Sequence, residues 1–302
     1  MKKTYILLLS LLLLFTGCTK EKQPAEDKKL EVVASTTMLA DLVSQIGKDH
    51  VDVTMLFGPS IDPHLVLPTG GDTKVIQKAD LVIFSGLHLE AQFGQVLSAY
   101  KDKTVLVGEK IDQSKLLYVE EDSGKEVDPH FWFSISLWKE AAKVVGEALK
   151  QHDAKHASDY EKNTNAYIAQ LDELDQWVKN RVSELTAEKK ILVTAHDAFN
   201  YFANSYGFEV ASIAGISTES EVTTEDVNKV ASVIVEKKVK SIFIESSVPQ
   251  TTVDAVIAEV VRRGSQVAIG KELFSDALGT DEYAQYIEAI KYNVNSIVDG
   301  LK

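Results

Sequence analysis

Residues 154–185, AKHASDYEKNTNAYIAQLDELDQWVKNRVSEL, contain no Gly or Pro and carry apolar side chains at helical spacing. The apolar positions recur at steps of mostly three, four or seven residues, at Tyr160, Tyr167, Ile168, Leu171, Leu174, Val178, Val182 and Leu185. Such a stripe predicts one amphipathic helix. At 1.5 Å rise per residue the helix would run roughly 45 Å, long enough to brace two domains. The alternative is a pair of shorter helices with a break near Asp172–Glu173.

Short β-rich runs alternate with helical stretches on both sides of this helix. Before it, strands are predicted at 30–35, 51–57, 80–85 and 104–107, with a helix at 37–46. After it, strands are predicted at 191–195, 208–214, 241–245 and 266–269, and helices at 199–206, 224–237, 251–262 and 283–301. This alternation is typical of βαβ units and a parallel sheet. We therefore predict an α/β fold with two similar lobes of parallel-rich sheet, joined by one long rigid backbone helix.

The N-terminus has the pattern of an export signal. Lys2 and Lys3 precede an apolar run at residues 5–15, which is too short to span a bilayer. The following LLFTGC, residues 13–18, resembles a bacterial lipobox, although Phe15 stands where Leu is usual. In such signals the peptidase cuts before the Cys, so we expect Cys18 to carry lipid and to anchor the protein on the extracytoplasmic side of the cell membrane. An ordinary signal peptide with an incidental Cys is the alternative.

The predicted boundaries follow from these patterns: a signal peptide at 1–17, a flexible tether at 18–29, an N-terminal lobe at 30–153, the linking helix at 154–186 and a C-terminal lobe at 187–302. Ligands of open α/β sheets bind beyond the carboxyl ends of the strands, so the cleft between the lobes is the expected site. A rigid helix between the lobes predicts that this cleft closes only slightly.

The composition is that of a globular protein, with 302 residues, 45% hydrophobic and 25% charged. The net charge of -13 argues against nucleic acid as a partner, because phosphates require clustered Lys and Arg. The single Cys excludes an intramolecular disulfide and a thiolate metal cluster within one chain. We expect a monomer.

Three of the seven histidines stand at positions that suit a metal ligand. His64 and His130 each end an Asp-Pro-His triplet, in which the proline stiffens the turn that presents the imidazole. Asp62 or Asp128 could accept the second ring N–H of its histidine, or could instead cap nearby backbone. His196 follows the predicted strand 191–195, at the end where sites form.

A carboxylate completes this candidate set. Asp276 follows the last predicted strand of the second half. The four residues are far apart in sequence and bind one ion only if the fold brings them together, so their spacing alone leaves metal binding open. We do not assign the other histidines to metal: His50, His88, His152 and His156.

Several motifs, taken together and in order, resemble those of the TroA-like metal-binding lipoproteins, the zinc and manganese receptors of ABC importers. They are DPH at 62–64, DPHFW at 128–132, AHDAF at 195–199, IFIESS at 242–247 and LFSD at 273–276. The resemblance covers essentially the whole mature chain. It implies one divalent transition-metal ion per chain, bound by His64 and His130 from the first lobe and by His196 and Asp276 from the second. It also implies an ABC permease and its ATPase as partners.

Other residues near these motifs are expected to support the site. Glu245 ends an apolar strand at the level of His196 and is expected to orient a ligand, with a role as a substitute ligand as the alternative. Trp132, Phe131 and Phe274 flank the ligand motifs. They either exclude water from the ion or simply pack the lobes, and both roles are compatible.

The ligand set favours zinc, with manganese as the second candidate. Three imidazoles and one carboxylate suit tetrahedral zinc, and raw affinity favours zinc over manganese. Manganese receptors of this family often carry Glu where this chain has His196. Zinc receptors often carry a long His-rich insertion before the second Asp-Pro-His, whereas this chain has only EEDSGKE at 120–126.

Three other functions compete with metal import. A zinc-dependent hydrolase would need an open coordination position, and four convergent ligands would close it. A surface adhesin would use the metal as a structural ion. A receptor for a chelated metal or another solute would present Arg or Tyr in the cleft. We predict a solute-binding protein and not an enzyme.

Overall fold

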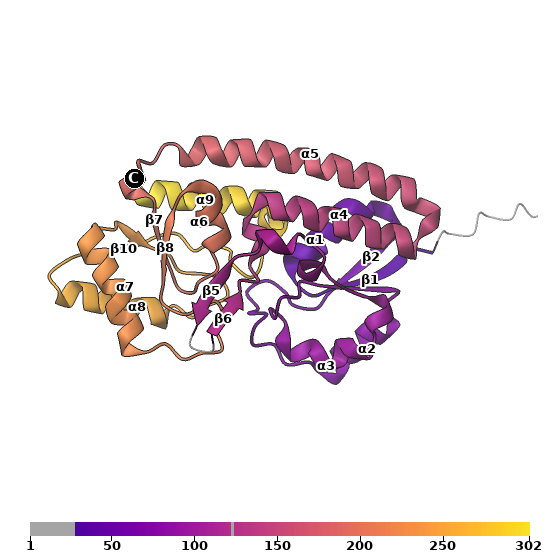
Figure 1. Ribbon diagram of the computed structural model, residues 1–302, viewed down its shortest axis with the longest axis horizontal. Helices are drawn as coiled ribbons and strands as arrows, with labels where there is room; N and C mark the ends of the chain where they lie inside the picture. The colour runs from indigo at the N-terminus through magenta and orange to yellow at the C-terminus, as the bar shows by residue number, and fades with distance from the viewer. Residues whose placement is uncertain (1–27, 122–123) are drawn as a thin grey trace, which may run out of the picture.

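The computed structural model describes residues 28–121 and 124–302. The predicted signal peptide, 1–17, and the predicted lipidation site, Cys18, lie outside the described residues. Two α/β lobes stand side by side, and one long helix runs above both of them (Figure 1). Within the described residues, no helix combines the length and apolar character needed to cross a membrane.

The first lobe is built on a parallel sheet with the strand order β2-β1-β3-β4. Its strands are β1 (Leu30–Ala34), β2 (Val51–Met55), β3 (Leu81–Phe84) and β4 (Thr104–Leu106). Every side chain of β3 is buried, as expected for a central parallel strand covered on both faces. The helices of this part of the chain are α1 (Thr37–Gly47), α2 (Gly70–Lys78), α3 (Gly94–Ser98) and α4 (Ile135–His152).

The second lobe repeats this arrangement. Its strands are β7 (Ile191–Thr194), β8 (Glu209–Ser212), β9 (Ser241–Ile242) and β10 (Ala268–Ile269), and its helices are α6 (Asn200–Tyr206), α7 (Thr224–Lys237), α8 (Thr251–Arg262) and α9 (Tyr286–Leu301). β7 pairs with β8 and β9 with β10, both in parallel. The Phe243 amide donates to the Val193 carbonyl at 2.8 Å and joins the two pairs. The order β8-β7-β9-β10 therefore matches that of the first sheet, and the predicted fold class is confirmed.

Several strands are shorter than the sequence predicts. The predicted strand 51–57 ends at Met55, and the predicted strand 266–269 begins at Ala268. The predicted strand 241–245 has regular pairing only at Ser241–Ile242, and Glu245 forms an isolated parallel bridge with Leu273. Phe57 and Phe243 are buried beyond the last paired residue of their strands, so the apolar pattern extends further than the strand pairing.

The long helix is α5 (Ala157–Val182), preceded by a 3-10 turn at Ala154–His156. It is continuous through Asp172–Glu173, so the single-helix prediction is confirmed, although the helix ends three residues before Leu185. At 1.5 Å per residue its 26 residues span about 39 Å. α5 packs on α1 and α4 of the first lobe and on α9 of the second.

Residues before the second Asp-Pro-His form a hairpin that the sequence did not predict. β5 (Tyr118–Glu121) pairs antiparallel with β6 (Gly124–Val127). Half of the residues in these two strands are charged, which obscures any alternation of apolar positions. The Tyr201 hydroxyl of α6 accepts from the Leu117 amide at 3.0 Å and donates to the Asp128 carbonyl at 2.8 Å. The hairpin is thereby fastened to the second half of the chain.

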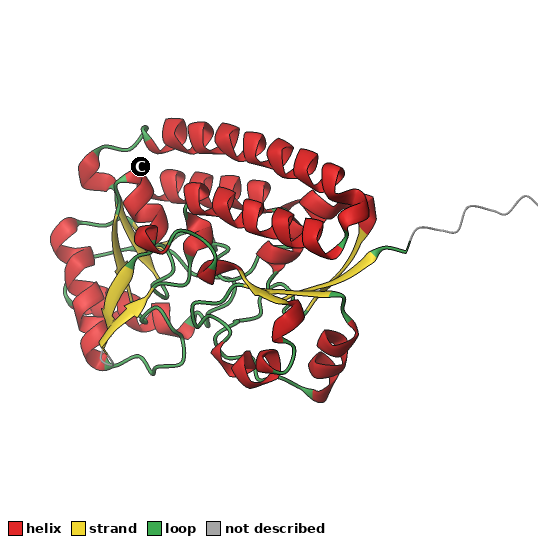
Figure 2. Cartoon of the chain, turned by 45° about the vertical axis from the view of Figure 1, so that its right-hand side comes forward, coloured by secondary structure: helices red, strands yellow, loops and turns green. Residues whose placement is uncertain are grey.

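A further set of contacts between the two halves of the chain lies where α9 begins. The Tyr286 amide donates to Asp41 Oδ2 at 2.9 Å, and its hydroxyl donates to the Trp132 carbonyl at 2.6 Å. The Tyr286 ring also stacks on Trp138, with 4.9 Å between ring centroids. These contacts join the two halves of the chain beneath α5. The loops that follow the strands gather between the two lobes (Figure 2).

Candidate metal centre

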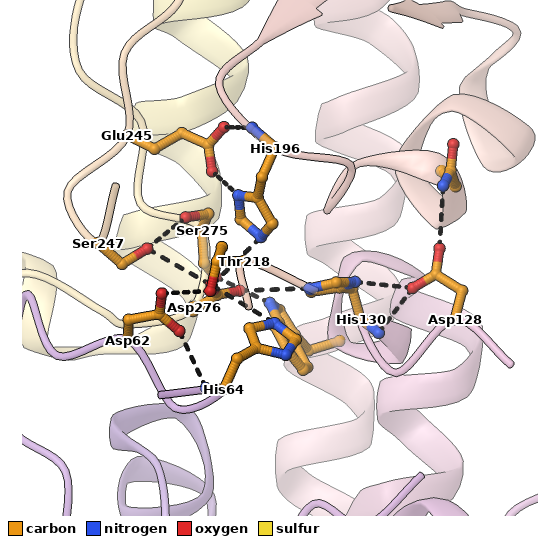
Figure 3. A network of polar contacts seen from close by, with 12 residues as sticks. Asp62, His64, Asp128, His130, His196, Thr218, Glu245, Ser247, Ser275 and Asp276 are labelled. Atoms are coloured by element: carbon orange, nitrogen blue, oxygen red, sulfur yellow. Dashed lines mark hydrogen bonds and ion pairs between the residues drawn. The ribbon is translucent and has the colours of Figure 1, made fainter. Parts of the chain in front are cut away.

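Four loops bring the predicted ligands to one point. Among the residues that the structure describes, each of the following offers an atom within 4.8 Å of the others: His64, His130, His196 and Asp276. All four are buried, with at most 4% of the residue surface exposed. His64 follows β2, His130 follows β6, His196 follows β7, and Asp276 follows the bridge at Leu273. Figure 3 shows the three rings directed at one carboxylate.

Asp276 is the centre of this group. Its Oδ2 lies 3.2 Å from His196 Nε2 and 3.9 Å from His64 Nε2, and its Oδ1 lies 3.4 Å from His130 Nε2. The Ser247 hydroxyl approaches Oδ2 at 3.5 Å. The three Nε2 atoms and Asp276 Oδ1 are buried without a hydrogen-bond partner within the described part of the chain. Buried polar atoms normally have a partner, so this convergence fits a cation between them.

Asp128 holds His130 in two ways. Its Oδ1 accepts from the His130 amide at 2.9 Å and lies 2.8 Å from His130 Nδ1. Of the two roles left open by the sequence, Asp128 therefore performs both. With Nδ1 engaged, Nε2 is the nitrogen that faces the centre, as in many histidine ligands of metals.

Glu245 contacts both the backbone amide and the ring of His196, as Asp128 does with His130 (Figure 3). Its Oε1 accepts from the His196 amide at 2.9 Å, and its Oε2 lies 2.6 Å from His196 Nδ1. The contact that the sequence anticipated is present, and Glu245 faces the side of the ring opposite to Asp276.

Asp62 differs from Asp128 in what it contacts. Its Oδ1 accepts from the His64 amide at 2.9 Å, and its Oδ2 accepts from the Thr218 hydroxyl at 2.5 Å. Asp62 thus stabilises the backbone of the turn, which is the capping role of the two that the sequence left open. Burial raises the pKa of Asp62, while the Thr218 hydroxyl opposes that rise.

The protonation of the three imidazoles is set by their different neighbours. Burial lowers the pKa of His64 to about 3. Burial alone would also lower the pKa of His130, but the Asp128 carboxylate, with a smaller contribution from Asp276, raises it to about 9. For His196, burial is likewise outweighed by Glu245 and Asp276, so its pKa lies well above the usual value.

The pKa of Asp276 responds to the same pairs. Burial alone would raise it, but the cationic imidazoles of His196 and His130 hold it well below its usual range. In the metal-free centre, the raised pKa values of His130 and His196 favour the imidazolium form at neutral pH, whereas the lowered pKa of His64 favours the neutral ring.

Aromatic side chains pack beside the centre. The Trp132 ring lies edge-on to His130, with 5.2 Å between centroids, and its Nε1 donates to the Ser275 carbonyl at 3.0 Å. Trp132 thus both packs the ligand and links the lobes, and Phe131 is fully buried behind it. Phe274 instead packs against Tyr283 and Tyr292.

A pocket of about 530 Å³ opens beside His64, between the lobes. Its lining includes His88 and Val127 from the first half of the chain, and Ser217 and Glu219 from the second. Of the four predicted ligands, only His64 lines this pocket.

The structure also brings in residues that sequence reasoning missed. Thr218 and Ser247 lie in loops that follow predicted strands, so the rule that sites form at carboxyl strand ends could have flagged them. Asn200 lies four residues after His196, and its amide donates to Asp128 Oδ2 at 3.1 Å. The histidines left unassigned lie outside the ligand group: His50 and His156, for example, stack on each other with centroids 3.9 Å apart.

Comparisons with known proteins agree with this geometry. A family model described as zinc-uptake complex component A, periplasmic (ZnuA) matches residues 32–300. Manganese-binding lipoprotein MntA of Bacillus subtilis is 38% identical over 292 residues, covering 95% of each chain. Zinc-binding protein TroA of Treponema pallidum is 40% identical over 300 residues, covering 98% of this chain and 96% of its own.

Solved structures extend the likeness to three dimensions. The structure of periplasmic zinc-binding protein TroA from Treponema pallidum aligns with a TM-score of 0.87, covering 91% of this chain and 99% of its own. A manganese-bound periplasmic metal-binding protein from Candidatus Liberibacter asiaticus is 26% identical, with a TM-score of 0.79. Since the family model and these relatives each span nearly the whole chain, the protein belongs to the ZnuA family of periplasmic zinc-uptake components.

Proposed function

We propose that this protein captures one divalent transition-metal ion outside the cytoplasm and delivers it to the permease of an ABC importer. The ligands are His64, His130 and His196 through Nε2, and Asp276 through its carboxylate. The observation that carries the proposal is the convergence of four buried ligand atoms within 4.8 Å of one another, where the three Nε2 atoms and Asp276 Oδ1 have no hydrogen-bond partner among the described residues. The lobes extend over 30–153 and 187–302, the segment 154–186 links them, and lipid on Cys18 holds the chain at the membrane.

The acidic side chains around the buried centre support a cation. Asp276 directs its carboxylate at the point where the three rings meet. Asp128 and Glu245 each place a carboxylate oxygen beside the Nδ1 of a histidine ligand, at 2.8 and 2.6 Å. Carboxylates arranged around a buried cation offset its charge, in a region where an uncompensated charge is costly.

The donor set supports zinc over manganese. Imidazole nitrogen suits zinc well, whereas manganese favours oxygen ligands, and divalent affinities generally rise from manganese to zinc. Asp276 is the sole carboxylate of the four ligands, since Asp128 and Glu245 are directed at Nδ1 atoms on the far sides of the rings. Names of relatives include both a zinc-binding protein and a manganese-binding lipoprotein, so competition between the two ions is the decisive comparison.

The arrangement supports capture and not catalysis. Catalytic zinc usually has three protein ligands and keeps a position for water or substrate. Here a fourth protein ligand faces the same point, and the ligating residues are almost fully buried. Asp128 and Glu245 are engaged with ring nitrogens, so neither is placed to act as a general base toward a water on the ion.

Direct titration tests the proposal. Metal-free protein is expected to bind one zinc ion per chain, and zinc is expected to displace manganese when both compete at equal concentration. Isothermal titration calorimetry gives the stoichiometry, and elemental analysis after dialysis against both ions gives the preference. Binding of no ion, or of several equivalent ions, would contradict the proposal, whereas preferential retention of manganese would contradict only the assignment of zinc.

Metal binding is expected to release about two protons at pH 7. The raised pKa values of His130 and His196 mean that both rings are protonated before binding, while His64, with a pKa of about 3, is already neutral. Because each ring must lose its proton to coordinate the ion, affinity should fall by about 100-fold per pH unit as the pH decreases from 8 to 6. Calorimetry in buffers of different ionisation enthalpy measures the proton count. An affinity that is independent of pH over this interval would show that the rings are neutral before binding.

A further inference from the structure

Two of the proposed histidine ligands are held by aspartates, and each aspartate accepts a hydrogen bond from a residue far along the chain. Asp62 binds the His64 amide with one oxygen and the Thr218 hydroxyl with the other, at 2.9 and 2.5 Å. Thr218 lies in the loop between β8 and α7 of the second lobe. One carboxylate thus connects a first-lobe ligand to the opposite lobe (Figure 3).

Asp128 repeats this pattern with a different partner. One oxygen contacts the amide and the Nδ1 of His130, and the other accepts from the Asn200 amide at 3.1 Å. Asn200 is the first residue of α6 and is itself held by Asp197 at 2.9 Å. Both histidines contributed by the first half of the chain are therefore supported through contacts that reach the second half.

From this geometry we infer that Thr218 and Asn200 are positioning residues, which hold His64 and His130 in ligating geometry through Asp62 and Asp128 only while the lobes are closed. The inference rests on the proposed function and adds a release step to it. When the lobes separate, each aspartate loses its partner from the second half of the chain. The loop that carries His64 and the ring of His130 are then free to move away from the ion.

The His64 side of this arrangement is the more sensitive one. His64 lies in a loop between β2 and α2, where Ile61, Leu65 and Leu67 are exposed. Apart from backbone turns, the loop relies on Asp62 for its shape at the ligand. His130, in contrast, also packs against Trp132 and precedes the buried segment Phe131–Phe133. Loss of the Thr218 contact should therefore affect the ion more than loss of the Asn200 contact.

The test is the rate at which zinc leaves the loaded full chain when a strong chelator is added in excess. Thr218→Val keeps the shape of the side chain and removes the hydroxyl, and it is expected to release zinc about ten-fold faster than the wild type. Thr218→Ser restores the hydroxyl and should return the rate to within about two-fold of the wild type. Asn200→Leu should accelerate release in the same direction but by less.

A neighbouring contact between the lobes provides the matched control. Gln92 Nε2 donates to Glu219 Oε1 at 2.9 Å, one residue beyond Thr218, and neither side chain contacts a ligand or its aspartate. Gln92→Ala removes a bond between the lobes without disturbing Asp62. It should leave the release rate unchanged, because zinc release depends on the hydrogen bond between Thr218 and Asp62 and not on contact between the lobes in general.

A double-mutant cycle identifies the route of the effect. If Thr218 acts through Asp62, then adding Thr218→Val to Asp62→Ala should produce no further acceleration. Three outcomes would overturn the inference while leaving metal binding intact. Zinc could leave Thr218→Val at the wild-type rate, or it could leave Gln92→Ala as fast as it leaves Thr218→Val. Alternatively, Thr218→Val could accelerate release as much in the Asp62→Ala background as in the wild type. A wild-type chain that binds no zinc would overturn the proposed function, and this inference with it.

Discussion

Asp276→Asn is expected to weaken zinc binding by about 100- to 1,000-fold. Structural zinc sites with four ligands bind with about 10–16 kcal/mol, or about 2.5–4 kcal/mol for each ligand, which corresponds to a loss of this order in affinity. The amide has nearly the same shape as the carboxylate but carries no charge and is a poor zinc ligand. Asp276 also has contacts with all three imidazoles, at 3.2, 3.4 and 3.9 Å, so no other ligand is as central.

The same substitution should change the metal-free protein. Asp276 raises the pKa of both His130 and His196, so its loss should lower both values and reduce the number of protons released on binding. Competition with a chelator of known affinity measures the binding constant, and calorimetry measures the protons. Affinity within about three-fold of the wild type would exclude Asp276 as a ligand.

Glu90→Gln is the matched control for this experiment. Glu90 is a buried carboxylate of the first lobe that accepts from the Ser35 hydroxyl and from the Ser85 and Gly86 amides, at 2.5, 2.9 and 3.0 Å. It lies outside the ligand group. Its neutralisation should lower the stability of the fold but keep zinc affinity close to the wild-type value. Equal losses of affinity in the two variants would indicate general unfolding and not the removal of a ligand.

Zinc is expected to raise the melting temperature of the metal-free wild type by about 8–16 °C. A ligand that binds only the folded state at 1,000 times its dissociation constant adds about 4.1 kcal/mol of stability. For domains of this size, each kcal/mol raises the melting temperature by about 2–4 °C. The effect is large because the ion ties together four loops drawn from both lobes.

Differential scanning calorimetry with and without zinc measures this shift, and excess chelator should reverse it. Asp276→Asn at the same zinc concentration should show a much smaller rise, since the shift depends on the ratio of zinc to the dissociation constant. An equal shift in that variant would mean that zinc stabilises the fold from another place. If the wild type binds zinc tightly but its melting temperature does not change, the unfolded chain must bind zinc as well as the folded chain does.

The elements with strong periodicity were the ones that sequence predicted best. α5 was predicted as a single helix because its apolar stripe is long and contains no Gly or Pro, and its observed bounds differ from the prediction only at the ends. The buried strand β3 was equally clear, since all its residues are apolar. The β5–β6 hairpin was missed, because its shape depends on its partner strand and on Tyr201 and not on an apolar pattern of its own.

The sequence also indicated which residues would offer ligand atoms to the metal. Two Asp-Pro-His turns, a histidine after an apolar strand and an aspartate after the last strand named the four residues that the fold brings together. Their meeting at one ion was implied by the resemblance to the TroA-like lipoproteins, whereas the rule that ligands of open α/β sheets bind beyond the carboxyl ends of the strands pointed only to the cleft. Spacing alone left it open, because the distance between such loops depends on how two lobes pack.

Local chain chemistry therefore determined the helices, the strands and the identity of the donor atoms, since propensity, periodicity and proline stiffness act over a few residues. Tertiary packing decided that Asp128 contacts the ring of its histidine whereas Asp62 contacts only the backbone of His64. It set the pKa values of the three imidazoles. It also placed Thr218 against Asp62, 156 positions away. Burial, pKa and hydrogen bonding between lobes depend on distances through space, which no pattern along one segment can encode.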